Sequence, residues 1–312
     1  KDTQSREAEG GELRTFILLA LAGLGAQLVD GSLGMAYGVS STTLLLFVGI
    51  APALASAAVH IAEVGTTAVS GISHASFGNV DWSKIVWMAI PGGIGGFLGA
   101  SALVWASTME TTAGYVEPVV AIFLFLLGAY VLARFAFRRH ERPVNVRPIS
   151  RRFLAPLGLF AGFLDAMGGG GWGPISTPTL LSSGRMEPRK IIGTVDTSEF
   201  VVALCASLGF LFSLSFAEIP WQVVGALLAG GVVAAPVAAF IVKMLPTRIL
   251  GTAVGGVILL VNMQTFFEAV GLSGVLATIG YFLIVGIWAA AIVFAIAAIR
   301  RDRAISAEGQ PA

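Results

Sequence analysis

Residues 165–174 read Asp-Ala-Met-Gly-Gly-Gly-Gly-Trp-Gly-Pro (DAMGGGGWGP) and interrupt an apolar stretch that runs from residue 153 to 183. A membrane-spanning helix needs about 20 mostly apolar residues. After the glycines, only residues 174–181 are apolar enough to lie in a membrane, so the stretch is too short for two ordinary spans. It therefore predicts a broken re-entrant hairpin, in which two half-helices meet at a glycine break that is buried in protein or lines a cavity.

A second apolar stretch, residues 13–50, is interrupted in a similar way by DGSLGMAYG at residues 30–38. Offset by 135 residues, the two stretches match at Asp30 and Asp165, Gly34 and Gly169, Tyr37 and Trp172, Gly38 and Gly173, Thr42 and Thr177, and Leu45 and Leu180. With one residue added, the matches continue at Pro52 and Pro188, Val59 and Val195, His60 and Asp196, and Glu63 and Glu199, and later at Asp81-Trp82 and Pro220-Trp221. Chance similarity between glycine-rich apolar segments is the alternative, but matched acids within apolar segments favour an internal duplication.

The composition indicates that lipid surrounds most of the chain. Of its 312 residues, 56% are hydrophobic and 12% are charged, whereas a soluble domain carries about 25% charged residues. Further stretches long and apolar enough to span a membrane lie at about 52–73, 83–107, 116–137, 190–213, 220–243, 247–267 and 272–300.

Together these patterns predict an all-α integral membrane protein with two repeats, each a broken hairpin followed by three transmembrane helices, and one extra C-terminal helix. Five membrane segments per repeat is an odd number, so the second repeat would insert upside down relative to the first. The expected divisions are a polar N-terminal tail (1–12), repeat 1 (13–137), a basic linker (138–152), repeat 2 (153–267), the extra helix (268–300) and a C-terminal tail (301–312).

The placement of Lys and Arg predicts the orientation. Seven arginines lie in or beside the linker: Arg134, Arg138, Arg139, Arg142, Arg147, Arg151 and Arg152. Between apolar spans, such a run marks a cytoplasmic loop rather than a nucleic-acid site. The basic residues after position 300 place the C-terminus on the same side, as expected for a multi-pass protein of a bacterial cytoplasmic membrane. The net charge of +1 says nothing about partners, and the single cysteine, Cys205, excludes a disulfide framework within the chain.

The glycine breaks are the first candidate binding site. A half-helix that begins after a break has unpaired N–H groups and a partial positive charge at its start, which suits an anion. Hydroxyl side chains follow each break, and no Lys or Arg lies deep in either hairpin. Close helix packing is the alternative explanation for the small residues.

Acidic side chains inside apolar segments are the second candidate. They are Asp30, Glu63, Asp165, Asp196 and Glu199, and His60 lies three residues before Glu63 on the same helix face. Because burying a charge in a bilayer is costly, such groups face a cavity or a partner. They form either a proton-coupling site or a structural polar network. Possible secondary contacts are Gln27, Tyr37, Trp172, Asn262 and Gln264.

Two copies of a glycine-rich turn after an aspartate, each followed by a Pro-led helix with a polar residue near an acid, resemble the sulfite exporter TauE/SafE family. The closer copy is DAMGGGGWGPISTPTL followed by IIGTVDTSEF, and the likeness covers about residues 15–295. The resemblance implies transport, often outward and without ATP, of small sulfur-containing oxyanions such as sulfite or organosulfonates. The substrate-binding residues that it favours are Gly168, Gly169, Gly170, Gly171, Ser176, Thr177 and Thr194, with Gly31, Gly34, Ser41 and Thr42 as their counterparts.

The main alternative is a cation or metal-ion carrier that uses the membrane carboxylates, since these outnumber the membrane bases. A passive channel is another. A membrane-embedded enzyme is disfavoured because no Ser/His/Asp set and no H-E-x-x-H motif occurs. We therefore expect a non-enzymatic transporter with a small anion and the bilayer as partners, protons as a possible coupling ion, and no cofactor, resident metal or nucleic acid. Alternating access between the repeats is the expected mechanism.

Overall fold

In the computed structural model, which describes residues 2–137, 149–183, 185–241 and 247–308, the regular structure is helical throughout those ranges. The helices are α1 (Asp2–Leu33), α2 (Tyr37–Phe47), α3 (Pro52–Ser76), α4 (Trp82–Thr108), α5 (Ala113–Ala136), α6 (Arg151–Gly168), α7 (Trp172–Ser183), α8 (Pro188–Ser213), α9 (Trp221–Ile241), α10 (Thr247–Ala269) and α11 (Gly274–Glu308). Four arginines of the expected basic linker, Arg138, Arg139, Arg142 and Arg147, lie outside these ranges.

The two glycine stretches do interrupt helices, and both breaks use left-handed backbone. Between α1 and α2, Gly34 has φ 65° and Ala36 has φ 97°; between α6 and α7, Gly169 has φ 72° and Gly170 has φ 147°. Glycine adopts these angles without a steric penalty because it lacks a Cβ. Ala36 is the only described residue other than glycine with a positive φ, so the first break carries local strain that the second avoids.

Replacing Ala36 with glycine is therefore expected to stabilise the protein. A left-handed alanine costs about 1–2 kcal/mol that glycine does not, which outweighs the smaller loss from a more flexible unfolded chain. Denaturant unfolding in mixed micelles should show a gain of about 1 kcal/mol. An unchanged or lower stability would mean that Ala36 contributes packing worth more than its strain.

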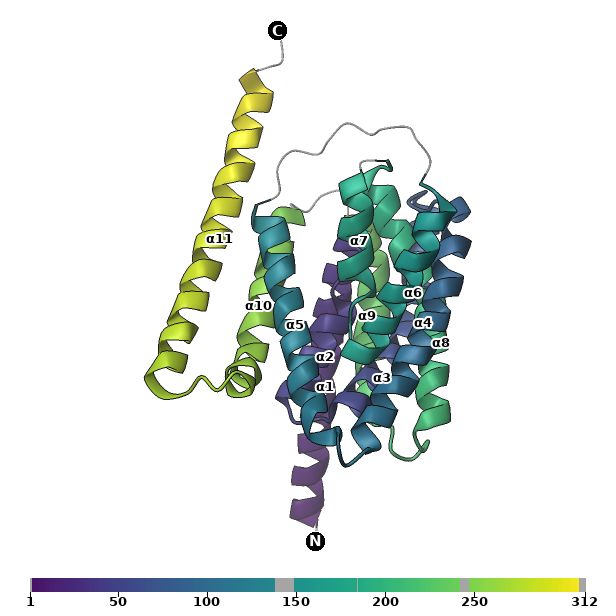
Figure 1. Cartoon of the computed structure of the whole chain (residues 1–312), viewed down its shortest axis with the longest axis vertical. Coiled ribbons are helices and arrows are strands. Elements are labelled where there is room, and N and C mark those ends of the chain that lie inside the picture. Colours follow the sequence, from purple (N-terminus) through teal and green to yellow (C-terminus); the bar gives the residue numbers. More distant parts are fainter. Residues whose placement is uncertain (1, 138–148, 184, 242–246, 309–312) are drawn as a thin grey trace.

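Helices at matched sequence positions begin at matched residues and have matched neighbours. The α2 and α7 helices start at Tyr37 and Trp172, α3 and α8 at Pro52 and Pro188, and α4 and α9 at Trp82 and Trp221. The α1 helix packs on α9 as α6 packs on α4, and α3 packs on α9 as α8 packs on α4. The α3–α8 and α5–α10 pairs join equivalent helices across the centre (Figure 1).

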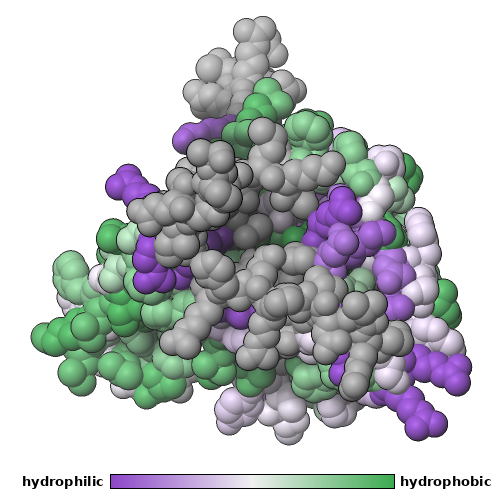
Figure 2. Space-filling model, turned by 90° about the horizontal axis from the view of Figure 1, so that it is seen from above, coloured by the Kyte–Doolittle hydropathy of each residue, from purple (hydrophilic) through white to green (hydrophobic). Residues whose placement is uncertain are grey.

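Different chain segments lie at the two ends of the bundle. In Figure 1 the N-terminus lies at the bottom, while α5 ends, α6 begins and the C-terminus emerges at the top. Viewed from the top, hydrophilic residues gather around the end of the bundle and hydrophobic ones line much of its outer edge (Figure 2). The two flanks of the basic linker thus share an end with the C-terminus, as the charge pattern predicts.

Seven of the described helices are long and apolar enough to cross a membrane. They cover Gly11–Leu33, Pro52–Ser76, Trp82–Thr108, Pro118–Ala136, Arg189–Ser213, Trp221–Phe240 and Gly274–Arg301. One detail differs from the sequence-based expectation. The first arm of the first hairpin is long enough to be counted as a span, because the helix continues through Asp30 to Leu33. The expected span 247–267 lies within the helix α10.

Residues 2–12 of the expected polar tail are helical and continue into the rest of α1, and α11 extends beyond residue 300 to Glu308. The α11 helix lies at the side of the bundle against α10 and α5 (Figure 1). Large apolar side chains such as Val275, Phe282 and Val293 are at least two-thirds exposed along it. A helix with such a surface fits a lipid environment.

Candidate functional site

The two breaks lie in direct contact. A Cβ on Gly38 would lie 2.9 Å from Gly170 Cα, and a Cβ on Gly173 would lie 2.7 Å from the carbonyl oxygen of Gly34. Gly38 and Gly173 occupy matched positions on the first turns of α2 and α7, so each half-helix packs against the break of the other hairpin. Only glycine allows two backbones to approach so closely.

Matched threonines complete this contact. The Thr177 hydroxyl donates to the carbonyl oxygen of Gly34, and Thr42 packs against Gly169. Each threonine belongs to the half-helix of one hairpin and touches the break of the other. The structure therefore brings together six of the predicted residues at one place: Gly34, Thr42, Gly169, Gly170, Gly171 and Thr177.

Each break is capped by the aspartate that precedes it. Asp165 Oδ1 accepts hydrogen bonds from the backbone N–H groups of Gly171 (2.7 Å) and Trp172 (2.9 Å). Asp30 Oδ1 lies 3.5 Å from the N–H of Tyr37, at the limit of a hydrogen bond. The starts of α2 and α7 thus face aspartates of their own hairpins, so the anion-binding capacity predicted for them is already partly used.

One group of titratable side chains, here called the His60 cluster, consists of His60, Glu63 and Asp165. Its members are buried, and one ligand atom of each lies within 4.8 Å of the others. His60 Nε2 is 3.1 Å from Asp165 Oδ2 and 3.9 Å from Glu63 Oε2. His60 and Glu63 are on α3, whereas Asp165 is on α6, so the cluster joins the two predicted repeats.

The hydrogen bonds of His60 determine where its protons lie. Nδ1 is 2.8 Å from the carbonyl oxygen of Ser56, which can only accept, so Nδ1 carries a proton. Nε2 faces a carboxylate oxygen of Asp165, so one proton must lie between these two atoms. Whichever atom holds it, the His60–Asp165 pair as a whole is neutral.

The second group, here called the Asp196 cluster, consists of Asp30, Asp196 and Glu199, again buried and within the same 4.8 Å. Asp196 and Glu199 are on α8, and Asp30 is on α1. The two clusters thus have the same plan: an aspartate from one hairpin meets two side chains from the helix that follows the other. The difference is that Asp196 stands where the first cluster has His60.

Several acid oxygens lack hydrogen bonds to protein groups. In the described part of the chain, Asp30 Oδ2, Glu199 Oε2 and both carboxylate oxygens of Glu63 and of Asp196 have no such partner. An unsatisfied carboxylate in a buried site costs several kcal/mol unless a proton, an ion or water compensates it. The clusters therefore need a proton, an ion or water to compensate these oxygens.

Ser41 and Ser176 are matched residues on the second turns of α2 and α7. Both side chains are buried, and neither hydroxyl finds a hydrogen-bond partner among the described residues. Their neighbour Glu63 reaches the same region, since its Oε1 would lie 3.2 Å from a Cβ on Gly38. Free hydroxyl donors beside a helix break are suitable ligands for an oxyanion.

Other predicted site residues have partners elsewhere. The Thr194 hydroxyl accepts from the N–H of Asp81 at the start of α4. Tyr37 donates to Leu227 of α9 and Trp172 to Val195 of α8, so both aromatic residues anchor neighbouring helices. The side-chain polar atoms of these three residues do not take part in the contact between the breaks.

The remaining predicted residues hold helices together or lie at the edge of the site. Asn262 donates to Thr43 and thereby ties α10 to α2. Gly31 packs on Ala238 of α9, and Gly168 packs on Phe123 of α5. Gln27 is buried one turn before Asp30. Gln264 is on α10, and its side chain lies outside the described part.

Asp81 lies outside the spans, at the N-cap of α4. Its side chain accepts from Ser83 and is 3.7 Å from Lys84. Partial burial raises the pKa of Asp81, but the Ser83 hydrogen bonds and the Lys84 charge lower it more, so the pKa lies below its usual value. Asp81 is therefore ionised at neutral pH, which favours the start of α4.

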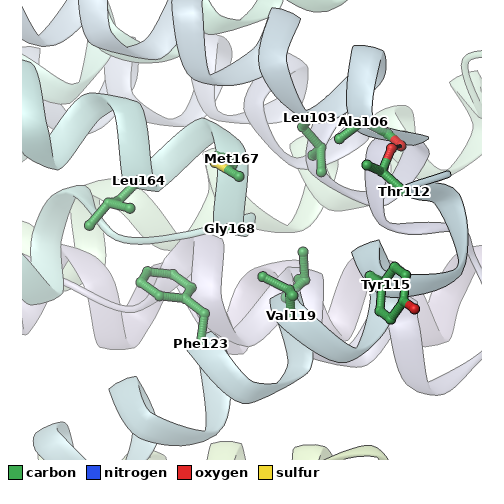
Figure 3. A pocket seen from close by; sticks show the side chains of 10 residues that line it. Leu103, Ala106, Thr112, Tyr115, Val119, Phe123, Leu164, Met167 and Gly168 are labelled. Atoms are coloured by element: carbon green, nitrogen blue, oxygen red, sulfur yellow. Dashed lines mark hydrogen bonds between the residues drawn. The ribbon is translucent and has the colours of Figure 1, made fainter. Parts of the chain in front are cut away.

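An apolar cavity of about 280 Å³ lies between α4, α5 and α6. Figure 3 shows Leu103, Phe123 and Met167 around it, and it reaches Gly168 next to the second break. Its lining is almost entirely apolar, so it does not form the polar site. The acids, hydroxyls and breaks lie in the packed interior beyond it.

The structure adds residues that the sequence analysis did not select. Ser56, Ser70 and His74 lie on α3 and face the two clusters. His74 lies 14 residues after His60 on the same helix, a spacing close to four helical turns. This spacing is the sequence signal that could have selected His74 together with His60. The two serines have no such signal, because small polar residues are common in membrane helices.

A bundle of spanning helices, interrupted by two touching breaks and lined there with buried acids and hydroxyls, defines a polytopic membrane protein of the transporter class. The family model described as Sulfite exporter TauE/SafE matches residues 19–265, and the chain belongs to this family. The chain is also 47% identical over 290 residues to the probable membrane transporter protein YtnM of Bacillus subtilis (strain 168). The aligned region covers 92% of this chain and 94% of YtnM. No solved structure matches the chain.

Proposed function

We propose that the chain transports small sulfur-containing oxyanions, such as sulfite or organosulfonates, and binds them where the two hairpins meet. The observation that carries this proposal is the pair Ser41 and Ser176, whose buried hydroxyls lack partners in the described structure on the matched half-helices. Membership of the sulfite exporter family supports the substrate class. Export would follow an outward gradient or a coupled ion, without ATP.

The electrostatics of the site support coupling to protons. An oxyanion near Glu63 and its neighbours would be repelled if all these carboxyls were ionised. Anion binding is therefore linked to neutralisation of the acids, and by reciprocity protonation of the acids strengthens anion binding. The protons that neutralise the acids would then cross the membrane together with the anion.

The internal symmetry supports alternating access. Equivalent helices begin at equivalent residues and pack on equivalent partners, as expected for two inverted repeats, each with a re-entrant hairpin. Rocking one repeat against the other about the contact between the breaks would expose the site to each side in turn. Locking the two hairpins together with a cross-link at positions outside the tight contact between the breaks should then stop flux, whereas continued transport would contradict rocking at this contact.

The central test is flux of sulfite and short sulfonates into liposomes. Losing a hydrogen bond to a charged ligand costs about 1.5–3 kcal/mol, so Ser41→Ala and Ser176→Ala should each weaken apparent affinity by about 10-fold or more. Ser101→Ala is the control, because the Ser101 hydroxyl already has a partner, the carbonyl oxygen of Phe97 within α4. Equal effects in all three variants would contradict a hydroxyl-lined anion site.

Coupling is tested in the same vesicles with and without a pH gradient. Glu63→Gln and Glu199→Gln remove a titratable group while keeping its size, so flux should lose its dependence on the gradient. Uptake of a divalent cation in place of anions, blocked by these variants, would instead support a cation carrier. Flux that does not saturate would indicate a channel.

A further inference from the structure

The two clusters differ at one matched position, and this difference decides their charge. In the His60 cluster, the hydrogen bonds leave a neutral pair, His60 and Asp165, with Glu63 as the additional acid. Asp165 also accepts two backbone N–H groups. The matched pair in the other cluster is Asp30 and Asp196, two acids with no base between them.

No basic side chain among the described residues neutralises these acids. No Lys or Arg forms an ion pair with these acids in the ranges that the structure describes. His74 Nε2 is 3.9 Å from Asp196 Oδ2, but it donates to the carbonyl oxygen of Gly31 at 3.1 Å, while Nδ1 accepts from Asn79. An imidazole with one donor and one acceptor is neutral.

Two further polar side chains lie beside the Asp196 cluster. Gln27 and Ser70 are fully buried, and neither the Gln27 amide nor the Ser70 hydroxyl has a partner within the described ranges. A Cβ on Gly31, next to Asp30, would lie 3.6 Å from Gln27 Nε2 and 3.6 Å from Ser70 Oγ. Ser70 also faces Asp196. These unsatisfied oxygen-bearing groups are independent of the carboxylates and point to a ligand.

We propose that the Asp196 cluster binds a small hard cation through Asp30, Asp196 and Glu199, with Ser70 and Gln27 as further oxygen ligands. The shared proton of His60 and Asp165 takes the place of this ion in the His60 cluster. The proposed binding of the ion depends only on the geometry of the Asp196 cluster. A role of this ion in coupling depends, in addition, on the proposed anion transport.

The dimensions of the Asp196 cluster fit an ion of this kind. For three atoms that are at most 4.8 Å apart, there is a point that lies within about 2.8 Å of all three, and Ca²⁺–oxygen distances are about 2.3–2.6 Å. All five candidate ligands offer oxygen and none offers sulfur or imidazole nitrogen. Such a set favours alkali or alkaline-earth ions over zinc or copper.

The test is a thermal-shift titration of the purified full chain in detergent at fixed pH and ionic strength. NaCl, MgCl₂ and CaCl₂ are compared with choline chloride, and no sulfur anion is present. We expect at least one of the ions to raise the Tm by about 5 °C at saturation. Asp196→Asn and Glu199→Gln should abolish the rise, whereas Glu63→Gln, the matched variant in the other cluster, should keep it.

A second variant distinguishes loss of the ion site from misfolding. Asp196→His copies the His60 arrangement, so it should fold and have a Tm that no longer responds to the ion. An unresponsive wild-type Tm, a response to pH alone, or a rise that persists in Asp196→Asn would each overturn the proposal. Because flux is not measured, a negative result here is distinct from failure of sulfite or sulfonate transport in liposomes.

Discussion

Replacing Gly170 with alanine is expected to destabilise the protein by about 3 kcal/mol or more and to abolish flux. Gly170 has φ 147°, and an added Cβ would overlap the backbone of Gly38 and Val39 on the opposite hairpin. Neither backbone can move away without separating the two breaks, so the free-energy costs of the strained backbone angle and of the steric overlap add. Denaturant unfolding in mixed micelles and liposome flux measure the two effects.

Two control glycines separate the causes. Gly49 also has a positive φ (85°) but nothing within 4 Å of its Cβ position, so Gly49→Ala should cost only about 1–2 kcal/mol. Gly25 lies within α1 with nothing within 4 Å, so Gly25→Ala should be neutral or stabilising by up to about 1 kcal/mol. If Gly170→Ala were no worse than Gly49→Ala, the contact between the breaks would not be tight.

Replacing Asp165 with alanine should destabilise the protein by about 3–5 kcal/mol. The change leaves the N–H groups of Gly171 and Trp172 without their acceptor and removes the partner of His60. Breaking a buried pair by removing one member is costly because the other remains uncompensated. Asp30→Ala is the matched control. It should cost less in cation-free buffer, because Asp30 makes one hydrogen bond of 3.5 Å.

A double-mutant cycle isolates the pair. Asp165→Asn keeps an acceptor for the two N–H groups, and His60→Gln keeps a donor of similar reach. The double variant should be less destabilised than the sum of the single variants, by about 0.5–3 kcal/mol. Additive effects, or equal losses for Asp30→Ala and Asp165→Ala, would contradict the shared proton between His60 and Asp165.

Much of the architecture follows from local sequence. Apolar stretches of about 20 residues predict spans because the bilayer sets the length, and within the described residues each predicted span is helical over most of its length. The glycines of residues 168–171 predict a break because left-handed backbone suits residues without a Cβ. The match between the two halves predicted two similar repeats, and in the structure helices at corresponding positions begin at corresponding residues.

The sequence predicted which residues belong to the candidate site, but not which of them contact one another. The acids were selected because buried charges are costly, yet nothing in the sequence pairs Asp165 with His60, which lies 105 residues away. The starts of the half-helices were expected to be open to an anion, but Asp30 and Asp165 face them. Thr194 was expected at the site, with Tyr37 and Trp172 as possible secondary contacts, and the side-chain polar atoms of all three bond elsewhere.

The sequence by itself determined a membrane protein of helices with two glycine breaks and matched buried acids, because hydropathy, helix length and glycine conformation act over neighbouring residues. Only the tertiary structure decided that each hairpin acid meets the helix following the other hairpin, and that the breaks touch. These contacts depend on how α3 packs on α8 and how the hairpins cross, which side-chain packing across the whole bundle sets and no local pattern encodes.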